Sequence, residues 1–394
     1  MKLLIFLFIV QGVAILLSLF RLVSREIMTQ VLRLSYGPFL IFSGSVKILD
    51  PLGFSYKLQE YFDVFGLEWM NDFTLSLSIF VCALEIILGV LLIYGLYVKK
   101  ILQVNLVLIV GFTFLTFYSA YFNAVTDCGC FGDFMKLDPW FSFQKDVFFL
   151  VVSYFLLSYH ATIKPIYSVR WLHRSLIIIV LFVFFIPFYG LSHLPMIDFR
   201  AYNVGSNIME KRMLPEDAKQ DQYEDVWYYE IDGVVQEFAT SDNPWQIKGA
   251  KFIDRETKLI FKGDEPLIKD FDIIDDENQL NLTDSILSLK RVLLLISYDI
   301  EKTNIKGHSK IKNSILTHLK GTDIPIYGLS SSSQNDIKKI LSKNVLDYPY
   351  FAVDQTTLKT IIRSNPGVIM LEKGVVTNKW HWRDIPEDWS SYIK

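Results

Sequence analysis

Two cysteines one residue apart, Cys128 and Cys130, are the residues whose type and spacing best suit redox chemistry. Gly129 between them has no Cβ to oppose the tight curl that a disulfide across so short a ring requires. Such a ring is strained, and strained, exposed disulfides exchange readily in an oxidising compartment. Three interpretations stay open: a redox pair, a structural turn whose thiols only pack, and a soft-metal site that two thiolates would leave under-coordinated. We take the pair as the redox candidate and predict no metal site.

Glu85 is the second candidate for a role in chemistry. It lies 12 residues into an apolar stretch that begins near Phe73, about 18 Å along a helix at 1.5 Å per residue. A carboxylate at that depth in a membrane is costly and is by default a functional candidate, here for proton transfer. Cys82 and Gly89 share its helix face, and Cys82 is a further candidate for proton or electron transfer. The alternative is a protonated carboxyl group that bonds a neighbouring helix.

Long apolar stretches must position these residues. The mean hydropathy of +0.30 is hard to reconcile with one soluble globule, and only 24 of the 81 charged residues lie before Pro195. The net charge of -3 and the pI of about 6.1 exclude a broad nucleic-acid footprint. Crossing a bilayer takes roughly 17–25 apolar residues. Suitable stretches begin near Leu3, Val31, Phe73, Ile101, Phe143 and Ser175. The sequence thus predicts a helical membrane bundle of about six spans, the first retained rather than cleaved.

The charged residues of the loops predict how this bundle is oriented. Loops 21–33, 99–100 and 160–174 hold eight Lys and Arg residues. The alternate loops, 50–72 and 124–142, hold only two, among many acidic residues. Because basic loops stay in the cytoplasm during insertion, the acidic loops and the polar C-terminal half face outside. We expect a bacterial inner membrane protein with a periplasmic C-terminal domain.

The polar half begins with strand-like segments. Residues 226–238 and 251–261 each predict two strands around a turn, the first at Asp232-Gly233. Further on, strands alternate with helices, which predicts a largely parallel sheet that ends in an antiparallel hairpin. The order of elements, with Pro366 just before the penultimate strand, resembles the thioredoxin fold. Members of that family carry Cys-x-x-Cys after the first core strand, whereas residues 297–301 here are Ser-Tyr-Asp-Ile-Glu and no cysteine follows Cys130. A dithiol reaction in this domain is excluded.

At the outer end of the second span, Gly44, Lys47 and Pro51 can be explained singly as a close-packing glycine, a snorkelling lysine and a proline stop. Together with the cysteine loop and Glu85, the pattern resembles the DoxX and MauE-like membrane proteins over about residues 31–162. That resemblance implies a four-helix membrane domain. It matches the family at Gly44, Lys47, Asp50, Pro51, Glu85, Gly89, Cys128, Gly129, Cys130, Phe131 and Gly132. It also implies an association with thioredoxin-like partners in disulfide handling during methylamine dehydrogenase maturation.

The expected organisation has five parts. They are an extra N-terminal helix (1–30), a DoxX/MauE-like membrane domain (31–162), a sixth transmembrane helix (163–194), a β-rich connector (195–285) and a thioredoxin-like domain (286–394). Two functions follow. In the first, the Cys128-Gly129-Cys130 loop exchanges disulfides with a partner; no cofactor motif is evident, and a membrane quinone is kept as an optional electron carrier. In the second, the bundle is a non-enzymatic anchor or assembly subunit that presents the cysteine-free domain to an envelope protein.

Overall fold

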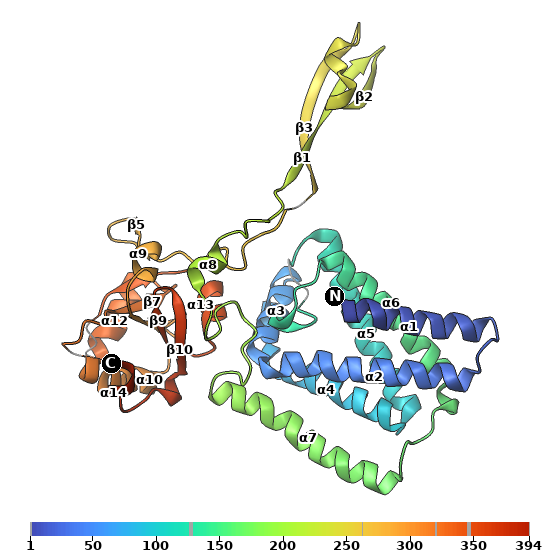
Figure 1. The fold of residues 1–394 in the computed structure, drawn as a ribbon, viewed down its shortest axis with the longest axis horizontal. Helices are drawn as coiled ribbons and strands as arrows, with labels where there is room; N and C mark the ends of the chain where they lie inside the picture. Colours follow the sequence, from blue (N-terminus) through green and yellow to red (C-terminus); the bar gives the residue numbers. More distant parts are fainter. Residues whose placement is uncertain (1, 126–128, 262, 320, 345–347, 394) are drawn as a thin grey trace.

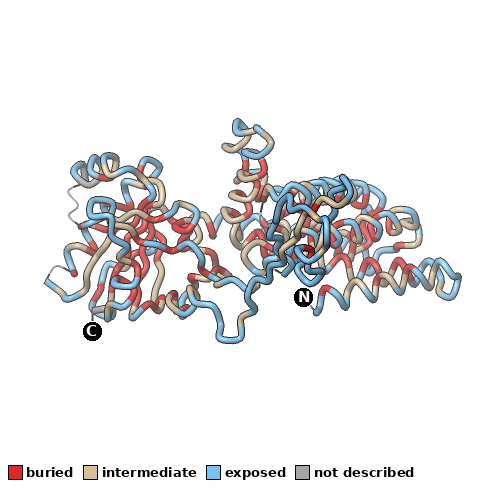
Figure 2. Tube along the Cα trace, turned by 90° about the horizontal axis from the view of Figure 1, so that it is seen from above, coloured by how far each residue is buried: buried red, intermediate tan, exposed pale blue. Residues whose placement is uncertain are grey.

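The computed structural model describes residues 2–125, 129–261, 263–319, 321–344 and 348–393, so Cys128 of the predicted redox pair lies outside the described residues. A helical bundle forms the first half of the chain and an α/β domain its C-terminal part. A three-stranded arm stands away from both (Figure 1). Buried residues run through the bundle and the α/β domain alike (Figure 2).

Long helices occupy all six predicted positions of the bundle. They are α1 (Lys2–Leu19), α2 (Arg25–Leu49), α4 (Thr74–Tyr94), α5 (Val98–Phe122), α6 (Pro139–Ser158) and α7 (Val169–Ser192). Five of these, with the 3-10 turn η1 (Glu68–Phe73) counted as the start of α4, are long and apolar enough to cross a membrane. The sixth helix, α2, has 25 residues and carries charges, among them Arg33 and Lys47.

An additional helix, α3 (Pro51–Val64), follows α2 directly in a segment that the sequence predicted only as an outer loop. Asp50 forms the corner between the two helices. It ends α2, and its side chain accepts a hydrogen bond from the backbone N–H of Gly53, with Pro51 at the first position of α3. An acidic cap followed by proline favours a helix start, so the predicted proline stop also begins the next helix.

Glycines allow α2 and α4 to approach closely. A Cβ on Gly44 would lie 2.8 Å from the Cys82 carbonyl oxygen, and one on Gly89 would lie 2.6 Å from the Gly37 carbonyl oxygen. Neither position has room for a side chain. Small residues at crossing points let membrane helices pack backbone to backbone, and this contact sets the distance between the polar side chains that the two helices carry.

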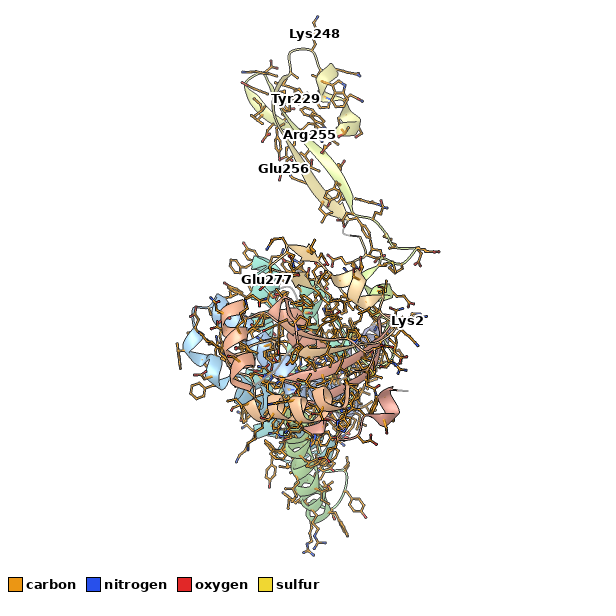
Figure 3. The ribbon with its side chains drawn as sticks, turned by 90° about the vertical axis from the view of Figure 1, so that its left-hand side faces the viewer. Lys2, Tyr229, Lys248, Arg255, Glu256 and Glu277 are labelled. Carbon is orange, nitrogen blue, oxygen red and sulfur yellow. The ribbon has the colours of Figure 1, made fainter. Side chains whose placement is uncertain are left out.

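The arm is an antiparallel sheet of order β2-β1-β3, built from β1 (Gln222–Ile231), β2 (Val234–Ala239) and β3 (Lys251–Phe261). Asp232 and Gly233, both with positive φ, form the predicted hairpin turn. The prediction of two strands within residues 251–261 is wrong. These residues contain neither glycine nor proline, and they pair with β1 along their whole length as one strand. The arm, which carries Tyr229 and Arg255, rises clear of the other parts (Figure 3).

The short helix α8 (Ile208–Arg212) precedes the arm, and the C-terminal α/β domain follows it. Its sheet has the order β10-β9-β6-β7-β8-β4-β5. The strands are β4 (Ile274–Asp275), β5 (Leu280–Asn281), β6 (Val292–Ile296), β7 (Ile326–Ser330), β8 (Tyr350–Ala352), β9 (Gly367–Glu372) and β10 (Val375–His381). The helical segments include α9 (Thr283–Leu287), α10 (Ile305–Lys310), α12 (Gln334–Asn344), α13 (Gln355–Ile361) and α14 (Ser390–Ile393).

This domain has the predicted thioredoxin-like arrangement. Strands β6, β7 and β8 are parallel, whereas β9 runs antiparallel to β6 and β10 antiparallel to β9. Every residue of β6 is buried, since helices and loops cover both faces of the sheet. The peptide bond between Asn365 and Pro366 is cis, at the position expected from the fold. The short strands β4 and β5, which lie before residue 286, join the edge of the same sheet.

Candidate functional site

Lys47 of α2 and Glu85 of α4 form a buried ion pair inside the bundle. The Lys47 Nζ lies 2.7 Å from the Glu85 Oε1, and the two side chains are only 2% and 3% exposed. The glycine contacts between α2 and α4 bring the helices close enough for this pair. The carboxylate predicted to be functional therefore has a cationic partner. Lys47 does not snorkel outward, because a buried carboxylate stabilises its charge in place.

Cys130 lies beside this pair. The Ser43 Oγ is 3.4 Å from the Glu85 Oε2 and 3.3 Å from the Cys130 carbonyl oxygen, so one hydroxyl group can bond either acceptor. Cys130 itself is half-buried and lines the same cavity as Lys47 and Glu85. The structure thus brings together Glu85 and Cys130, two of the predicted site residues.

A second buried ion pair, Lys145 with Asp146 on α6, borders the same cavity and was missed in the sequence. The Thr116 hydroxyl donates to the Asp146 Oδ2 at 3.1 Å, and the Lys145 Nζ lies 5.9 Å from the centroid of the Phe131 ring. A signal was present, because two adjacent charged residues inside an apolar span are costly and mark a functional position.

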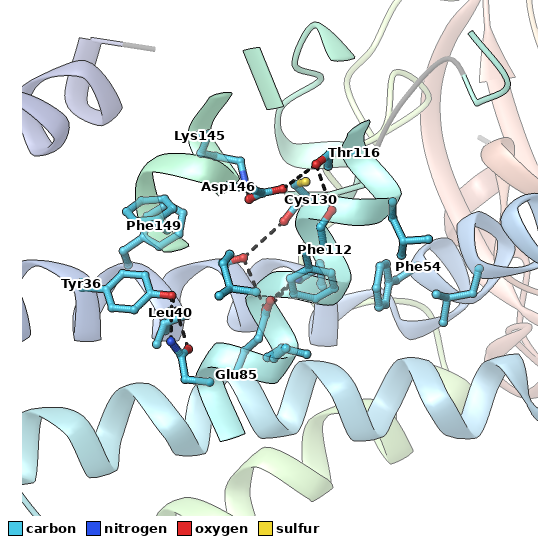
Figure 4. Close-up of a pocket in the computed structure, with 18 of the residues that line it drawn as sticks. Tyr36, Leu40, Phe54, Glu85, Phe112, Thr116, Cys130, Lys145, Asp146 and Phe149 are labelled. Carbon is cyan, nitrogen blue, oxygen red and sulfur yellow. Dashed lines mark hydrogen bonds and ion pairs between the residues drawn. The ribbon is translucent and has the colours of Figure 1, made fainter. Parts of the chain in front are cut away.

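The cavity among these groups is small and mixed in character (Figure 4). Its polar lining consists of Tyr36, Ser43, Lys47, Glu85, Asn105, Thr116, Cys130, Lys145 and Asp146, and the rest is aliphatic and aromatic. Water can enter about 40 Å³ of it, whereas an engineered cavity known to bind benzene has about 150 Å³. The cavity therefore admits a few water molecules and does not fit the ring of a membrane quinone.

Cys82 lies one helical turn before Glu85 on α4. It is fully buried on α4 in an apolar cluster with Ile48, Phe54 and Leu58, and it does not line the cavity that holds Cys130. Gly89, on the same side of α4, contacts Gly37 of α2. The helix face that carries Cys82, Glu85 and Gly89 is buried, as expected. On this face Cys82 packs in the apolar cluster and does not line the cavity with Cys130.

Lys47 also lines a second, smaller cavity. Water can enter about 20 Å³ of it, beside Asp50, Asp133, Asp198 and Arg200. The Arg200 Nε donates to the Asp198 Oδ1 at 2.6 Å, but its Nη1 and Nη2 are buried and have no hydrogen-bond partner among the described residues. Burial by itself raises the pKa of Asp198, but Arg200 and Lys379 outweigh this and lower it to about 2. This cluster could not be predicted from the sequence, because its residues meet only through the fold.

The position that holds the dithiol in thioredoxin-like enzymes lies near Pro366. The segment after β6 reaches it, with the Asn304 backbone N–H bonded to the Asn365 carbonyl oxygen at 2.9 Å. Thr303 and His308 contact each other there, the Thr303 Oγ1 lying 3.0 Å from the His308 Nε2. This segment contains no cysteine, so the domain has the frame of a thioredoxin without its reacting atoms.

Comparisons with known proteins give matches to two parts of the chain. Residues 25–159 match the family described as methylamine utilisation protein MauE. A search of curated proteins gives no match. Among solved structures, the thioredoxin domain of a thiol-disulfide oxidoreductase from Bacteroides vulgatus is 18% identical, with a TM-score of 0.26, over 31% of this chain and 92% of that chain.

Another solved domain is similar to the same degree. The C-terminal domain of a predicted thiol-disulfide oxidoreductase from Bacteroides thetaiotaomicron is 16% identical, with a TM-score of 0.23, over 28% of this chain and 81% of that chain. The fold assignment here rests on the strand order and directions of the sheet. This protein is a multi-pass membrane protein that joins a MauE-family membrane region, residues 25–159, to a C-terminal thioredoxin-like domain.

Proposed function

We propose that this protein is a thiol-disulfide exchange component of a bacterial inner membrane, with Cys128 and Cys130 as the exchanging pair. The observation that carries the proposal is the common cavity of Cys130, Glu85 and two buried lysines. Paired charges inside a membrane bundle are costly to maintain and mark functional sites. The two lysines beside Cys130 favour its thiolate form.

In the proposed reaction, a thiolate of a partner protein attacks one sulfur of the Cys128–Cys130 disulfide, and the other loop sulfur leaves as a thiolate. The partner's second thiol then resolves the mixed disulfide, so the partner is oxidised and the loop becomes a dithiol. The two protons of the partner's thiols end on the loop sulfurs. Lys47 and Lys145, which line the cavity with Cys130, stabilise the departing thiolate, and Glu85 stays ionised as the partner of Lys47.

The loop returns to the disulfide by the reverse exchange with a disulfide-bearing protein. We route no step through a quinone, because the cavity is too small for its ring. Cys82, which is buried and does not line the cavity, takes no part in this scheme. The C-terminal domain has no cysteine and supplies no thiol.

The basic loops support a topology with the cysteine loop and the C-terminal domain on the periplasmic side. A membrane-impermeant maleimide applied to intact cells tests this topology. We expect Cys128 and Cys130 to be modified only after reduction. Modification that requires permeabilised cells, even after reduction, would place the loop on the other side.

Redox titration of the purified full-length protein in detergent tests the chemistry. In the Cys82→Ala variant the pair is the whole thiol content, and its oxidation in glutathione buffers is read as a gel shift with maleimide-polyethylene glycol. We expect two modified thiols in reducing buffer and none in oxidising buffer. Each single variant, Cys128→Ser and Cys130→Ser, should instead trap a mixed disulfide with glutathione. A pair that keeps both thiols in oxidising buffer would rule out the proposal.

The second candidate function, a non-enzymatic assembly subunit, is favoured by the arm. Its strand β3 is exposed over its whole length, and aromatic side chains such as Trp245 and Phe252 are about half exposed. Trp and Tyr are enriched at binding hot spots. Deletion of residues 222–261 tests this function. The deletion should leave the glutathione titration unchanged, and an envelope protein that co-purifies with the full-length protein should be lost. If the full-length protein co-purifies with no envelope protein, the assembly function is contradicted.

A further inference from the structure

The end of the cysteine loop is held from outside the bundle by two residues of the C-terminal half. Arg363 of the thioredoxin-like domain places its Nη2 3.2 Å from the Asp133 Oδ2, three residues after Cys130. The next loop residue, Phe134, packs edge-on against Phe199, with ring centroids 5.1 Å apart. These contacts join residues far apart in sequence, so only the tertiary structure brings them to the loop.

Arg363 has every nitrogen of its guanidinium group engaged. Its Nε lies 3.0 and 2.8 Å from the two Asp50 carboxylate oxygens, and its Nη1 donates to the Lys359 carbonyl oxygen. The ring of Tyr56 on α3 lies 5.3 Å from its Cζ. One planar fork therefore ties the α2–α3 corner, the cysteine loop and the thioredoxin-like domain together, a geometry that arginine provides and lysine does not.

This contact is buried and strongly charged. The Arg363 side chain is 4% exposed, while those of Asp50 and Asp133 are 19% and 31% exposed. Burial lowers the pKa of a guanidinium group, but the two carboxylates outweigh this and raise the pKa of Arg363 above its usual value. Without Arg363, two carboxylates would face each other at the base of the loop, and like charges repel.

Bundle residues hold the loop at this end as well, because Phe131 is buried in the core and Phe134 also packs against Phe42 of α2, with ring centroids 5.4 Å apart. Gly129 and Gly132 both have positive φ, 66° and 51°, conformations that glycine adopts easily. A Cβ on Gly129 would lie 3.0 Å from the Lys57 Cγ, so the loop rests on α3. The α3 helix is in turn capped by Asp50, which Arg363 binds.

We propose that Arg363 is a positioning residue for the cysteine loop, through which the cysteine-free thioredoxin-like domain sets the exposure and reactivity of Cys130. The proposal rests on the proposed function for its biological meaning, because it concerns regulation of the same loop. It gives the domain a role that needs no dithiol. The domain's face next to Pro366, where Arg363 lies, binds the chain's own membrane region.

Alkylation of Cys130 tests this proposal without requiring exchange activity. In a Cys82→Ala/Cys128→Ser background Cys130 is the sole cysteine, and its rate of reaction with N-ethylmaleimide is followed by mass spectrometry on the full-length protein in detergent. We expect Arg363→Gln and Asp133→Asn each to raise that rate about tenfold, since each removes a charge-assisted hydrogen bond that holds the loop. Arg363→Lys keeps the charge but not the planar guanidinium fork, so its alkylation rate should lie between that of these two variants and that of the parent.

Arg383→Gln is the matched control. Arg383 lies at the same interface and donates to the Ser192 carbonyl oxygen at 3.1 Å, but it does not touch the loop. Its variant should alkylate at the parent rate. The double variant Arg363→Gln/Asp133→Asn should react no faster than the faster single variant, because both changes break one contact.

Unchanged rates in both Arg363→Gln and Asp133→Asn would overturn the proposal, as would an equal increase in Arg383→Gln. Should Arg363→Gln fail to fold, Asp133→Asn alone decides, since Asp133 is a partly exposed loop residue. The glutathione midpoint of the Cys82→Ala protein, with and without Arg363→Gln, gives a second readout, and we expect it to shift. A pair that never oxidises would defeat the proposed function, while the alkylation rates would still test Arg363.

Discussion

The buried ion pair of Lys47 and Glu85 gives the sharpest prediction for the membrane region. Lys47→Met removes the ammonium group and, among the described residues, leaves the Glu85 carboxylate with the long Ser43 contact, at 3.4 Å, as its hydrogen-bond donor. Both partners are at most 3% exposed, so bulk solvent cannot replace the lost ion. Breaking a buried pair in this way costs about 3–5 kcal/mol, because one charge stays buried without compensation.

The double variant Lys47→Met/Glu85→Met separates pairing from packing. With both charges replaced by apolar side chains of similar length, we expect stability within about 1 kcal/mol of the parent or above it. Reversible unfolding of the detergent-solubilised protein in sodium dodecyl sulfate gives the free energies. Lys57→Met is the matched control, because the pair of Lys57 with Glu60 on α3 is exposed and worth less than about 1 kcal/mol.

Additive costs would refute this reasoning. If the double variant lost the sum of the two single losses, the residues would act independently and the pair would carry no coupling. A Lys47→Met variant as stable as the Lys57→Met control would likewise contradict the burial argument.

Two further predictions concern packing and pH. Gly44→Val places a side chain where even a Cβ would lie 2.7 Å from the Ile86 Cγ1, so it should cost at least about 1–3 kcal/mol in the same unfolding assay. Gly111→Val, with open space around its Cα, should cost under about 1 kcal/mol, and equal losses would contradict the close approach. Burial lowers the pKa of His308 from 6.5 to about 4. The unfolded chain therefore binds an extra proton between these pH values, and stability falls by about 3 kcal/mol as the pH drops from 6.5 to 4. His308→Gln should reduce the slope of thermal stability against pH over that window, where His381, also lowered to a pKa of about 4 by burial, still contributes. A slope unchanged from the parent would contradict this assignment.

The membrane helices and the α/β domain could be predicted from local patterns. Apolar runs long enough for a bilayer located the helices, because lipid demands that every backbone group be bonded within its own segment. In the polar half, the apolar segment 292–297 flanked by alternating helices and strands indicated a sheet buried on both faces. Both signals are local, because each depends only on neighbours in sequence. The additional helix α3 was missed because the Asp50-Pro51 stop that ends α2 also begins it, and the single long strand β3 was missed because its pairing with β1 sets its limits.

Only part of the candidate site could be predicted from the sequence. Glu85 stood out because a carboxylate in an apolar span must find a partner, and the cysteine spacing marked the loop. The identity of that partner was not visible, because Lys47 near a helix end is equally well explained by snorkelling. The Lys145–Asp146 pair carried the same signal as Glu85 and was overlooked.

The sequence by itself determined which segments cross the membrane, which domain resembles thioredoxin and that this domain lacks a dithiol. The tertiary structure decided that Cys130, Glu85 and two lysines share one cavity, that Cys82 stays apart, and that Arg363 holds the cysteine loop. The physical reason is the separation along the chain between the residues that interact. Hydropathy and periodicity act between neighbours in the chain. Ion pairs such as Arg363 with Asp50, 313 residues apart, form only after helices, loop and domain have packed together.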